Sequence, residues 1–252
     1  MMYNNVEAIE MKYLKELSSL KLFNKKDIIN ICGNVNNANF ILKSYIDRGY
    51  ITKIKKDYFV INDLVNDTPA ANKYEIACGY GDDDFISHHS VFEFYGFNNQ
   101  VYNTVDVTTN THKRDYTFDD TIYKYHRSDN LIQVNSLLGI KISSIERAIV
   151  DCIKDSSDFE YYELLECINN INVIDDSKIM RYLESLNNKL LYKKVGFVLE
   201  KFKHALNISD NFFFECKERS RNIVGYYNLQ AKESLVFNAK WRLFVNKDME
   251  EK

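Results

Sequence analysis

The feature that most restricts the fold of this chain is the order of structural signals in its first 63 residues. VEAIEMKYLKELSSLKL (6–22) carries apolar residues at three- and four-residue steps, the spacing of an amphipathic helix. A second helix is predicted over KKDIINICG, with Asn24 as its N-cap and Gly33 at its end. A third is predicted over 36–48, and YITKIKKDYFVIND (50–63) predicts a short β-hairpin with a KKD turn. Three helices followed by a basic hairpin predict a winged helix-turn-helix.

The third helix is the candidate for base contacts, because in this fold it enters the major groove of DNA while the wing lies along the phosphates. The side chains expected to pack inward are Phe40, Ile41, Ser44 and Tyr45. The side chains expected to approach base edges are Asn36, Asn37 and Asn39. An asparagine can pair with N6 and N7 of adenine, which suits an AT-rich operator. Asn36 or Asn37 could equally be the N-cap of this helix.

Positive charge is concentrated in this region, although the chain as a whole is slightly acidic. The chain has 33 Lys and Arg against 36 Asp and Glu, a net charge of −3. Between Lys43 and Asp57, five basic residues stand against two acidic ones, and such a local patch can attract phosphates. The residues expected to contact phosphates are Lys43, Lys53, Lys55 and Lys56. Tyr58 could touch a sugar from the wing or anchor the wing to the core.

A domain boundary is predicted at LVNDTPAANKY (64–74), which holds the only proline and several turn-forming residues. We therefore expect a winged helix-turn-helix domain over 1–67 and a larger mixed α+β domain over 68–252. Apolar residues alternate with Thr and Asn through 100–142 and predict several strands, whereas helices are expected through 143–204. The predicted fold class is α+β.

The segment DDDFISHHSVFEFYGF (82–97) raises the question of a metal or nuclease centre. The side chains that would have to converge on a metal are Asp82, Asp83, Asp84 and His88. The same residues suit a capped helix over about 86–96 with a buried aromatic face. No HExxH or PD-(D/E)xK type of motif accompanies them, so we expect no metal site and a buried, hydrogen-bonded His88.

A second polar constellation is SSIERAIVDCIKD, which predicts a helix capped by Ser143 or Ser144. Glu146 stands where a capping box with Ser143 could form. Glu146, Arg147 and Asp151 could act in acid–base catalysis, but no His or Cys nucleophile pattern lies nearby in the sequence. We expect capping and salt-bridge roles for them, and no catalytic residues.

Several classes of function lack their sequence signals. The five cysteines are far apart and never form CxxC, which favours buried thiols in a reducing compartment, so we expect a cytoplasmic protein. No GxxxxGK[ST] or GxGxxG loop is present, and no cofactor is expected. The sequence has no signal-peptide pattern and no apolar run approaching 18 residues, so we expect no membrane partner.

These segments, taken in order, resemble the AbiEi family of antitoxins, from type IV toxin–antitoxin and abortive phage infection systems, over nearly the whole chain. FISHHSVFEFYGF (85–97) is similar to the family's I-S-H-x-S-A-x-x-x-x-G-h signature. ISSIERAIVDCI (142–153) is similar to its T-x-E-R-T-L-I-D-x-L block. YLESLNNKLLYKKVGFVLEKF (182–202) is similar to a helix pair of the family, and AKWRLFVN (239–246) to its closing K-W-R-h-h-h-N strand.

The resemblance implies a DNA-binding repressor of its own operon whose C-terminal domain neutralises a cognate nucleotidyltransferase-like toxin. Its expected partners are double-stranded DNA of its own promoter, with inverted repeats, and this toxin, with which no stable complex is required. The family performs no chemistry. Two other functions fit parts of the sequence: a DNA-targeted metal-dependent nuclease built on the residues around Asp84, and a ligand-responsive transcriptional regulator.

Overall fold

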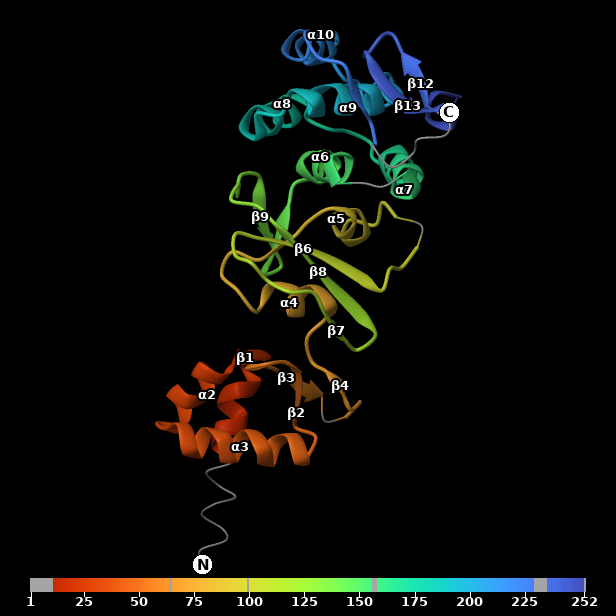
Figure 1. Ribbon diagram of the computed structural model, residues 1–252. Coiled ribbons are helices and arrows are strands. Elements are labelled where there is room, and N and C mark those ends of the chain that lie inside the picture. Colours follow the sequence, from red (N-terminus) through yellow and green to blue (C-terminus); the bar gives the residue numbers. More distant parts are fainter. Residues whose placement is uncertain (1–10, 64, 99, 156–157, 229–234, 252) are drawn as a thin grey trace, which may run out of the picture. The chain divides into compact units, whose positions relative to one another are not determined.

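The computed structural model describes residues 11–63, 65–98, 100–155, 158–228 and 235–251 (Figure 1). The chain divides into two compact units. The first comprises Met1–Ile86, Asn103–Arg127 and Leu137–Lys141, and the second comprises Ser87–Tyr102, Ser128–Ser136 and Ile142–Lys252. Residues 67 and 68, between which the sequence predicts a domain boundary, both belong to the first unit. Helices and sheets make up the protein, which is mixed α+β as predicted.

The N-terminal part of the first unit consists of helices packed beside a small antiparallel sheet (Figure 1). Residues 11–18 are helical, whereas Val6 and Ile9 of the predicted first helix lie outside the described residues. The elements that follow are β1 (Leu22–Asn24), α2 (Lys25–Cys32), α3 (Val35–Asp47), β2 (Ile51–Lys55), β3 (Tyr58–Asp63) and β4 (Thr68–Pro69). The sheet has the order β1-β3-β2, and β4 pairs with β3.

Local sequence signals explain where α2 begins and ends. The Asn24 side chain accepts hydrogen bonds from the backbone of Lys26 and Asp27, and Asp27 accepts one from the Asn24 backbone, which forms a capping box. Gly33 follows the helix with φ +80°, a left-handed conformation that glycine adopts without strain. Both predicted helix limits are confirmed. Strand β1 was not predicted, because three residues carry too little pattern; it forms by pairing with β3.

The larger sheet has six strands in the order β7-β8-β6-β5-β10-β9. Their bounds are β5 (Phe85–Ile86), β6 (Thr104–Thr109), β7 (Tyr116–Phe118), β8 (Thr121–Arg127), β9 (Val134–Leu137) and β10 (Ile140–Ser143). Most of the strands lie in the region where alternating apolar residues predict them. Strands β6 and β8 run parallel, while β7 pairs with β8 as a hairpin. Helix α4 (Lys73–Cys78) packs on β5 and β6.

The second unit is mainly helical and contains a three-stranded sheet. Its helices are α5 (His89–Phe94), α6 (Ile145–Asp155), α7 (Asp158–Asn169), α8 (Asp176–Leu186), α9 (Lys189–Glu200), α10 (Asp210–Arg219) and α11 (Lys247–Glu251). Strands β11 (Gly225–Tyr226), β13 (Leu243–Asn246) and β12 (Leu235–Asn238) pair in that order. Gly196 of α9 lies against the ring of Trp241, where any Cβ atom would overlap the indole. Within the described part of the chain, no helix is both long and apolar enough to span a membrane.

Candidate nucleic-acid interface and buried polar network

Helix α3 presents a polar outer face to solvent. Its N-cap is Asn34, whose side chain accepts a hydrogen bond from the backbone of Asn37 at 2.8 Å. The alternative that Asn36 or Asn37 caps the helix is therefore wrong. The side chains of Asn36, Asn37, Asn39 and Lys43 are all exposed. Asn36 and Lys43 lie on one stripe along the helix. Asn39 lies on one side of this stripe, and Asn37 lies on the opposite side.

Phe40 lies on this outer face and not in the core, where the sequence analysis placed it. Its side chain is 62% exposed, whereas its neighbour Ile41 is 4% exposed. The inward positions of α3 are Ala38, Ile41, Leu42 and Tyr45. At 100° per residue these four lie on one side of the helix, and Phe40 points almost directly away from them. The signal was present in the sequence, because Phe40 is four residues after Asn36 and three before Lys43.

The lysines of the β2–β3 hairpin separate into two groups. Lys53 and Lys56 are exposed, whereas Lys55 is partly buried. In a regular strand, residues two apart face the same side, so Lys53 and Lys55 would point together. A register shift in the pairing with β3 falls between these two residues and breaks that alternation.

Lys55 is enclosed by tyrosine rings of the first unit. Its Nζ lies 3.6 Å from the ring centroid of Tyr80 and 4.0 Å from that of Tyr116, and it donates a hydrogen bond to the Tyr125 hydroxyl at 3.2 Å. Ring faces attract a cation, but burial, together with the charge of Lys113, lowers the pKa of Lys55 to about 8. This placement differs from the expected phosphate contact, because the ammonium group is already held inside the unit.

Tyr58 is an anchor in the core. Its side chain is 0% exposed, and its hydroxyl donates a hydrogen bond to the carbonyl oxygen of Ile76 at 3.0 Å. Burial raises the pKa of this hydroxyl, which stays neutral. Of the two roles considered for Tyr58, contact with a sugar is contradicted by its burial, and anchoring agrees with its position.

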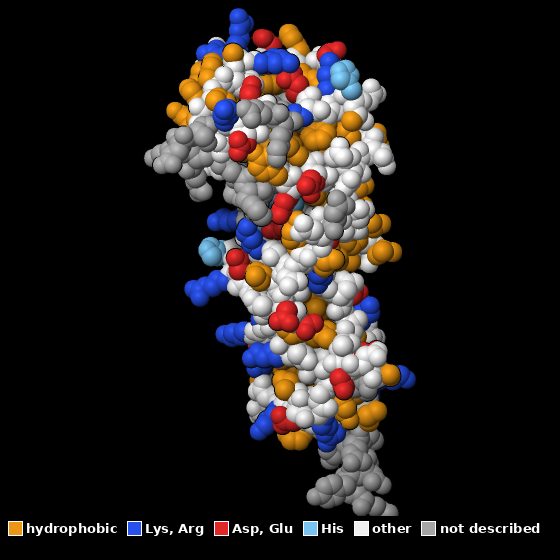
Figure 2. Space-filling model, turned by 90° about the vertical axis from the view of Figure 1, so that its right-hand side faces the viewer, with side chains coloured by type: hydrophobic (Ala, Val, Ile, Leu, Met, Phe, Trp, Pro, Cys, Tyr) orange, Lys and Arg blue, Asp and Glu red, His pale blue; other side chains and the backbone are white. Residues whose placement is uncertain are grey.

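The segment that contains α3 has an excess of basic residues. Residues 11–63 contain ten Lys and Arg and five Asp and Glu, although the whole chain has a net charge of −3. On the face drawn in Figure 2, hydrophobic side chains reach the surface among charged ones. This mixture of lysines, asparagines and an exposed phenylalanine is suited to a nucleic-acid duplex, which offers phosphates, base edges and methyl groups.

The stretch of acids and histidines does not form the predicted single helix. Phe85 and Ile86 form β5 and pair with Thr108 and Val107 of β6, and α5 begins only at His89. The apolar spacing of this segment predicts a helix, but Phe85 and Ile86 pair with β6 instead. Asp84 and His88 are therefore not one helical turn apart, and the expected helix start near residue 86 is wrong.

The acidic residues of this stretch have partners within the first unit. Asp84 is 0% exposed and accepts hydrogen bonds from Lys113 Nζ at 2.5 and 2.6 Å. Asp83 accepts one from the Asn110 side chain at 2.6 Å. A carboxylate neutralised by a lysine is a poor ligand for a cation, because the lysine charge repels the metal.

His88 is buried and hydrogen-bonded, as predicted. Its side chain is 6% exposed; Nδ1 lies 2.9 Å from Ser87 Oγ, and Nε2 lies 3.2 Å from Asp155 Oδ2. Its backbone has φ 51° and ψ −138°, a conformation that costs a non-glycine residue about 1–3 kcal/mol and that these contacts must hold in place. The order Ser, His, Asp resembles a nucleophile and its base, but Ser87 is fully buried and out of reach of a substrate.

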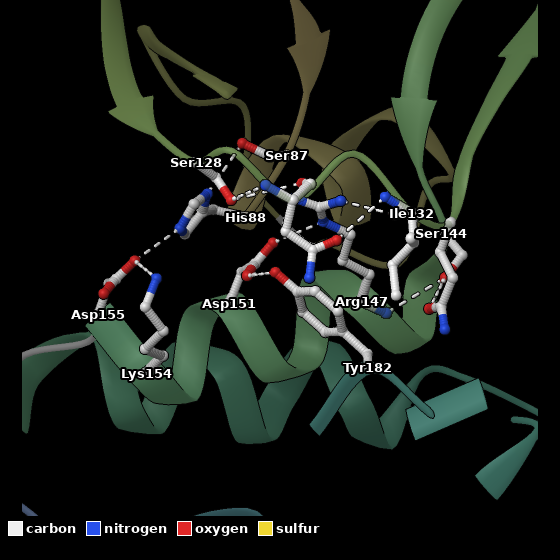
Figure 3. Close-up of polar contacts among 12 residues, drawn as sticks. Ser87, His88, Ser128, Ile132, Ser144, Arg147, Asp151, Lys154, Asp155 and Tyr182 are labelled. Carbon is white, nitrogen blue, oxygen red and sulfur yellow. Dashed lines mark hydrogen bonds and ion pairs between the residues drawn. The ribbon is translucent and has the colours of Figure 1, made fainter. Parts of the chain in front are cut away.

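Asp155 is the charged residue in the series of hydrogen bonds that links Ser87, His88 and Asp155 (Figure 3). Burial alone would raise the pKa of its carboxyl, but the hydrogen bond from His88 and the charge of Lys154, whose Nζ lies 3.2 Å away, lower it to about 2. Asp155 is therefore ionised at neutral pH.

A buried polar network is centred on Arg147 of α6 (Figure 3). Arg147 is 0% exposed; its Nε donates to Asp151 Oδ2 at 3.2 Å and its Nη1 to the carbonyl oxygen of Ile132 at 2.6 Å. Tyr182 of α8 donates its hydroxyl proton to Asp151 Oδ1 at 2.5 Å, and the Arg147 guanidinium lies 4.8 Å from its ring centroid. The predicted salt bridge within α6 is confirmed, and it ties α6 to α8.

The N-terminal end of α6 is held by Ser144. Its Oγ accepts a hydrogen bond from the Arg147 backbone at 3.2 Å and donates one to Gln133 Oε1 at 3.1 Å. Glu146 accepts a hydrogen bond from the Asp175 backbone at 3.2 Å, and it does not form the capping box expected with Ser143. The polar residues of this motif bind other parts of the second unit, which is a structural role.

Comparisons with known proteins add no relative. Neither the scan against protein-family models nor the search of curated proteins finds a match to this chain.

Proposed function

We propose that this protein is the antitoxin of a type IV toxin–antitoxin system, and that it represses its own operon by binding upstream DNA. The observation that carries the DNA-binding part is the outer face of α3, where Asn36, Asn39 and Lys43 are exposed beside a hairpin with two exposed lysines. In this proposal, residues 11–63 act as a winged helix-turn-helix, with α3 in the major groove and the β2–β3 hairpin as the wing.

The division of labour at this interface follows from the chemistry of the side chains. Asparagine amides pair with adenine N6 and N7, so Asn36 and Asn39 provide sequence specificity. Lys43, Lys53 and Lys56 contact phosphates and provide affinity that is independent of sequence and sensitive to salt. Lys55 and Tyr58 take no part, because both are held by groups of the protein itself.

The antitoxin activity is proposed to be non-enzymatic. The candidate acids and bases of the second unit, Arg147, Asp151 and His88, are buried with partners of their own, and this favours a structural role for them. The resemblance to AbiEi antitoxins supplies the rest of the proposal, which is a cytoplasmic protein that counteracts a nucleotidyltransferase-like toxin without a need for a stable complex.

The DNA-binding proposal is tested with the double variant Lys53→Glu/Lys56→Glu. Its affinity for the DNA upstream of the gene should fall by about tenfold or more at physiological salt, and the slope of log K against log salt should decrease by about one unit for each lost contact. The matched control is Lys124→Glu/Lys189→Glu, which reverses two exposed lysines elsewhere in the chain. If both double variants bind this DNA with equal affinity, the proposal that the β2–β3 hairpin contacts DNA as a wing is refuted.

The antitoxin proposal is tested by co-expression with a neighbouring nucleotidyltransferase-like gene. The full chain, and also its Lys53→Glu/Lys56→Glu variant, should restore growth when the toxin is induced, because neutralisation does not need the DNA interface. Point variants are preferred to a fragment of residues 68–252, since that cut would pass through the first compact unit. Persistent toxicity with the unaltered chain would exclude the antitoxin function.

The competing nuclease function is tested on the same DNA. Cleavage that requires a divalent cation and is lost in Asp84→Ala would favour an enzyme. We expect intact DNA, because the Asp84 carboxylate is already paired with Lys113.

A further inference from the structure

The outer face of α3 contains one residue that the proposed contacts with adenine and phosphate do not use. Phe40 lies between Asn36 and Lys43 on the same helical stripe, and its side chain is 62% exposed. Single exposed hydrophobic residues are common on protein surfaces. Phe40 is distinct because the residues one turn before and after it on the same stripe are the proposed base and phosphate contacts.

We propose that Phe40 reads the C5-methyl group of thymine, and so makes the protein selective for A·T pairs. This inference rests on the proposed DNA-binding function. In the major groove, thymine differs from every other base of unmodified DNA by its methyl group, and an apolar side chain such as phenylalanine makes a favourable contact with it. Asn36 pairs with adenine and Phe40 contacts thymine, so the two side chains recognise the two bases of A·T pairs.

The charge around Phe40 favours DNA over a second protein as the occupant of this face. Residues 11–63 contain ten basic and five acidic residues, and Lys43, Lys53 and Lys56 are exposed. Two copies of such a surface would repel each other, whereas the phosphates that border the major groove carry the complementary charge. An apolar side chain framed by asparagine and lysine also has the composition of a base-reading surface.

The test compares thymine with uracil, which lacks only the methyl group. The DNA upstream of the gene is amplified once with dTTP and once with dUTP, and the affinity of the full chain for each duplex is measured at the same salt concentration. The unaltered protein should bind the uracil duplex more weakly, by about fourfold for each methyl group that Phe40 contacts.

Variants assign this difference to one side chain. Phe40→Ala should bind the thymine duplex about as weakly as the unaltered protein binds the uracil duplex, and should lose little more when uracil replaces thymine. Phe40→Leu keeps an apolar side chain and should retain part of the thymine preference. The control is Phe214→Ala on α10, because Phe214 has a similar exposure of 60%; this variant should keep the full preference.

Each outcome decides between the proposals. If the unaltered protein does not bind the thymine duplex, both the proposed DNA-binding function and this inference are refuted. If it binds both duplexes equally, or if Phe40→Ala keeps the preference for thymine, only the inference is refuted. If Phe40→Ala weakens both duplexes equally and also changes the mass of the free protein in solution, Phe40 belongs to an interface between copies of this chain, and the inference is refuted as well.

Discussion

Helices α3 and α6 use their polar residues in opposite ways. In α6, Arg147 and Asp151 are buried, and each has hydrogen-bond partners within the second unit. In α3, Asn36 and Lys43 are exposed, and the apolar Phe40 is exposed with them. Both helices are amphipathic, and both begin after a polar N-terminal residue, so local pattern alone does not distinguish them.

The difference shows how a structural polar cluster can be told from a binding surface. A buried polar group destabilises the fold unless another group satisfies it, and the hydrogen bonds from Arg147 to Asp151 and to the Ile132 carbonyl oxygen explain how this side chain can be buried. An exposed asparagine or phenylalanine adds little to stability, so its substitution can test a role in binding without disturbing the fold. The comparison predicts that changes in α6 affect folding, whereas changes on the outer face of α3 affect DNA affinity.

The largest effect on stability is expected for Arg147→Met. Loss of the guanidinium leaves the Asp151 carboxylate buried without its countercharge, which should lower the free energy of unfolding by about 3–5 kcal/mol. The measurement is urea denaturation. The control Arg181→Met alters an exposed arginine on α8 and should change stability by about 0.5 kcal/mol or less. A similar small loss for both variants would mean that the network does not hold the second unit together.

A pair of buried tyrosines gives a sharper version of this prediction. Tyr182→Phe removes the hydroxyl that donates to Asp151 at 2.5 Å, and should cost about 1–3 kcal/mol. Tyr161 is equally buried, but its hydroxyl has no hydrogen-bond partner within the described part of the structure. Tyr161→Phe should therefore leave the protein as stable as before or more so. Equal losses in the two variants, measured by thermal unfolding, would show that partner satisfaction is not the controlling factor.

Sequence reasoning succeeded where local chemistry decides the structure. The capping box of Asn24 and the left-handed Gly33 depend on neighbouring residues alone, and both were predictable. The i,i+4 pair of Arg147 and Asp151 was predictable for the same reason. The fold of the acid–histidine stretch was not predictable, because Phe85 pairs with a strand more than 20 residues later, which no local pattern reveals.

The candidate interface was predictable only in part. The asparagines and Lys43 lie on the exposed face of a helix as expected, but the inward turn of Lys55 depends on a register shift between β2 and β3 and on distant tyrosines such as Tyr116. Its hydrophobic character favoured a core position for Phe40, but helical spacing places it on the side of α3 away from Ala38 and Leu42. For Phe40, the helical spacing predicts exposure correctly, whereas the hydrophobic residue type does not.

A smaller effect, which depends on pH, is expected for Lys55→Met. The pKa of Lys55 is lowered from 10.5 to about 8 in the folded protein. Between these values the unfolded chain holds a proton that the folded chain has released, so the contribution of Lys55 to stability rises with pH. Below pH 8 both states are protonated and this dependence ends. Relative to Lys55→Met, the unaltered protein should gain about 1 kcal/mol between pH 7.5 and 9.5.

The measurement for Lys55 is urea denaturation at several pH values. Lys53→Met is the control, because it removes an exposed lysine from the same strand. If the difference in free energy of unfolding between the unaltered protein and Lys55→Met stays constant over this pH range, the prediction is wrong. The tyrosine rings then compensate for burial, and Lys55 stays fully protonated between them.

The smallest effect on stability is expected for Phe40→Ala, and its neighbour supplies the contrast. Ile41 is 4% exposed and Phe40 is 62% exposed, although the two are adjacent in α3. Ile41→Ala should cost about 2–5 kcal/mol through the cavity it leaves, whereas Phe40→Ala should change the free energy of unfolding by about 0.5 kcal/mol or less. Thermal unfolding of the two variants measures this contrast. A loss of several kcal/mol in Phe40→Ala would place this side chain in a protein core or interface. Unchanged stability together with weaker DNA binding would assign Phe40 to the surface that contacts DNA.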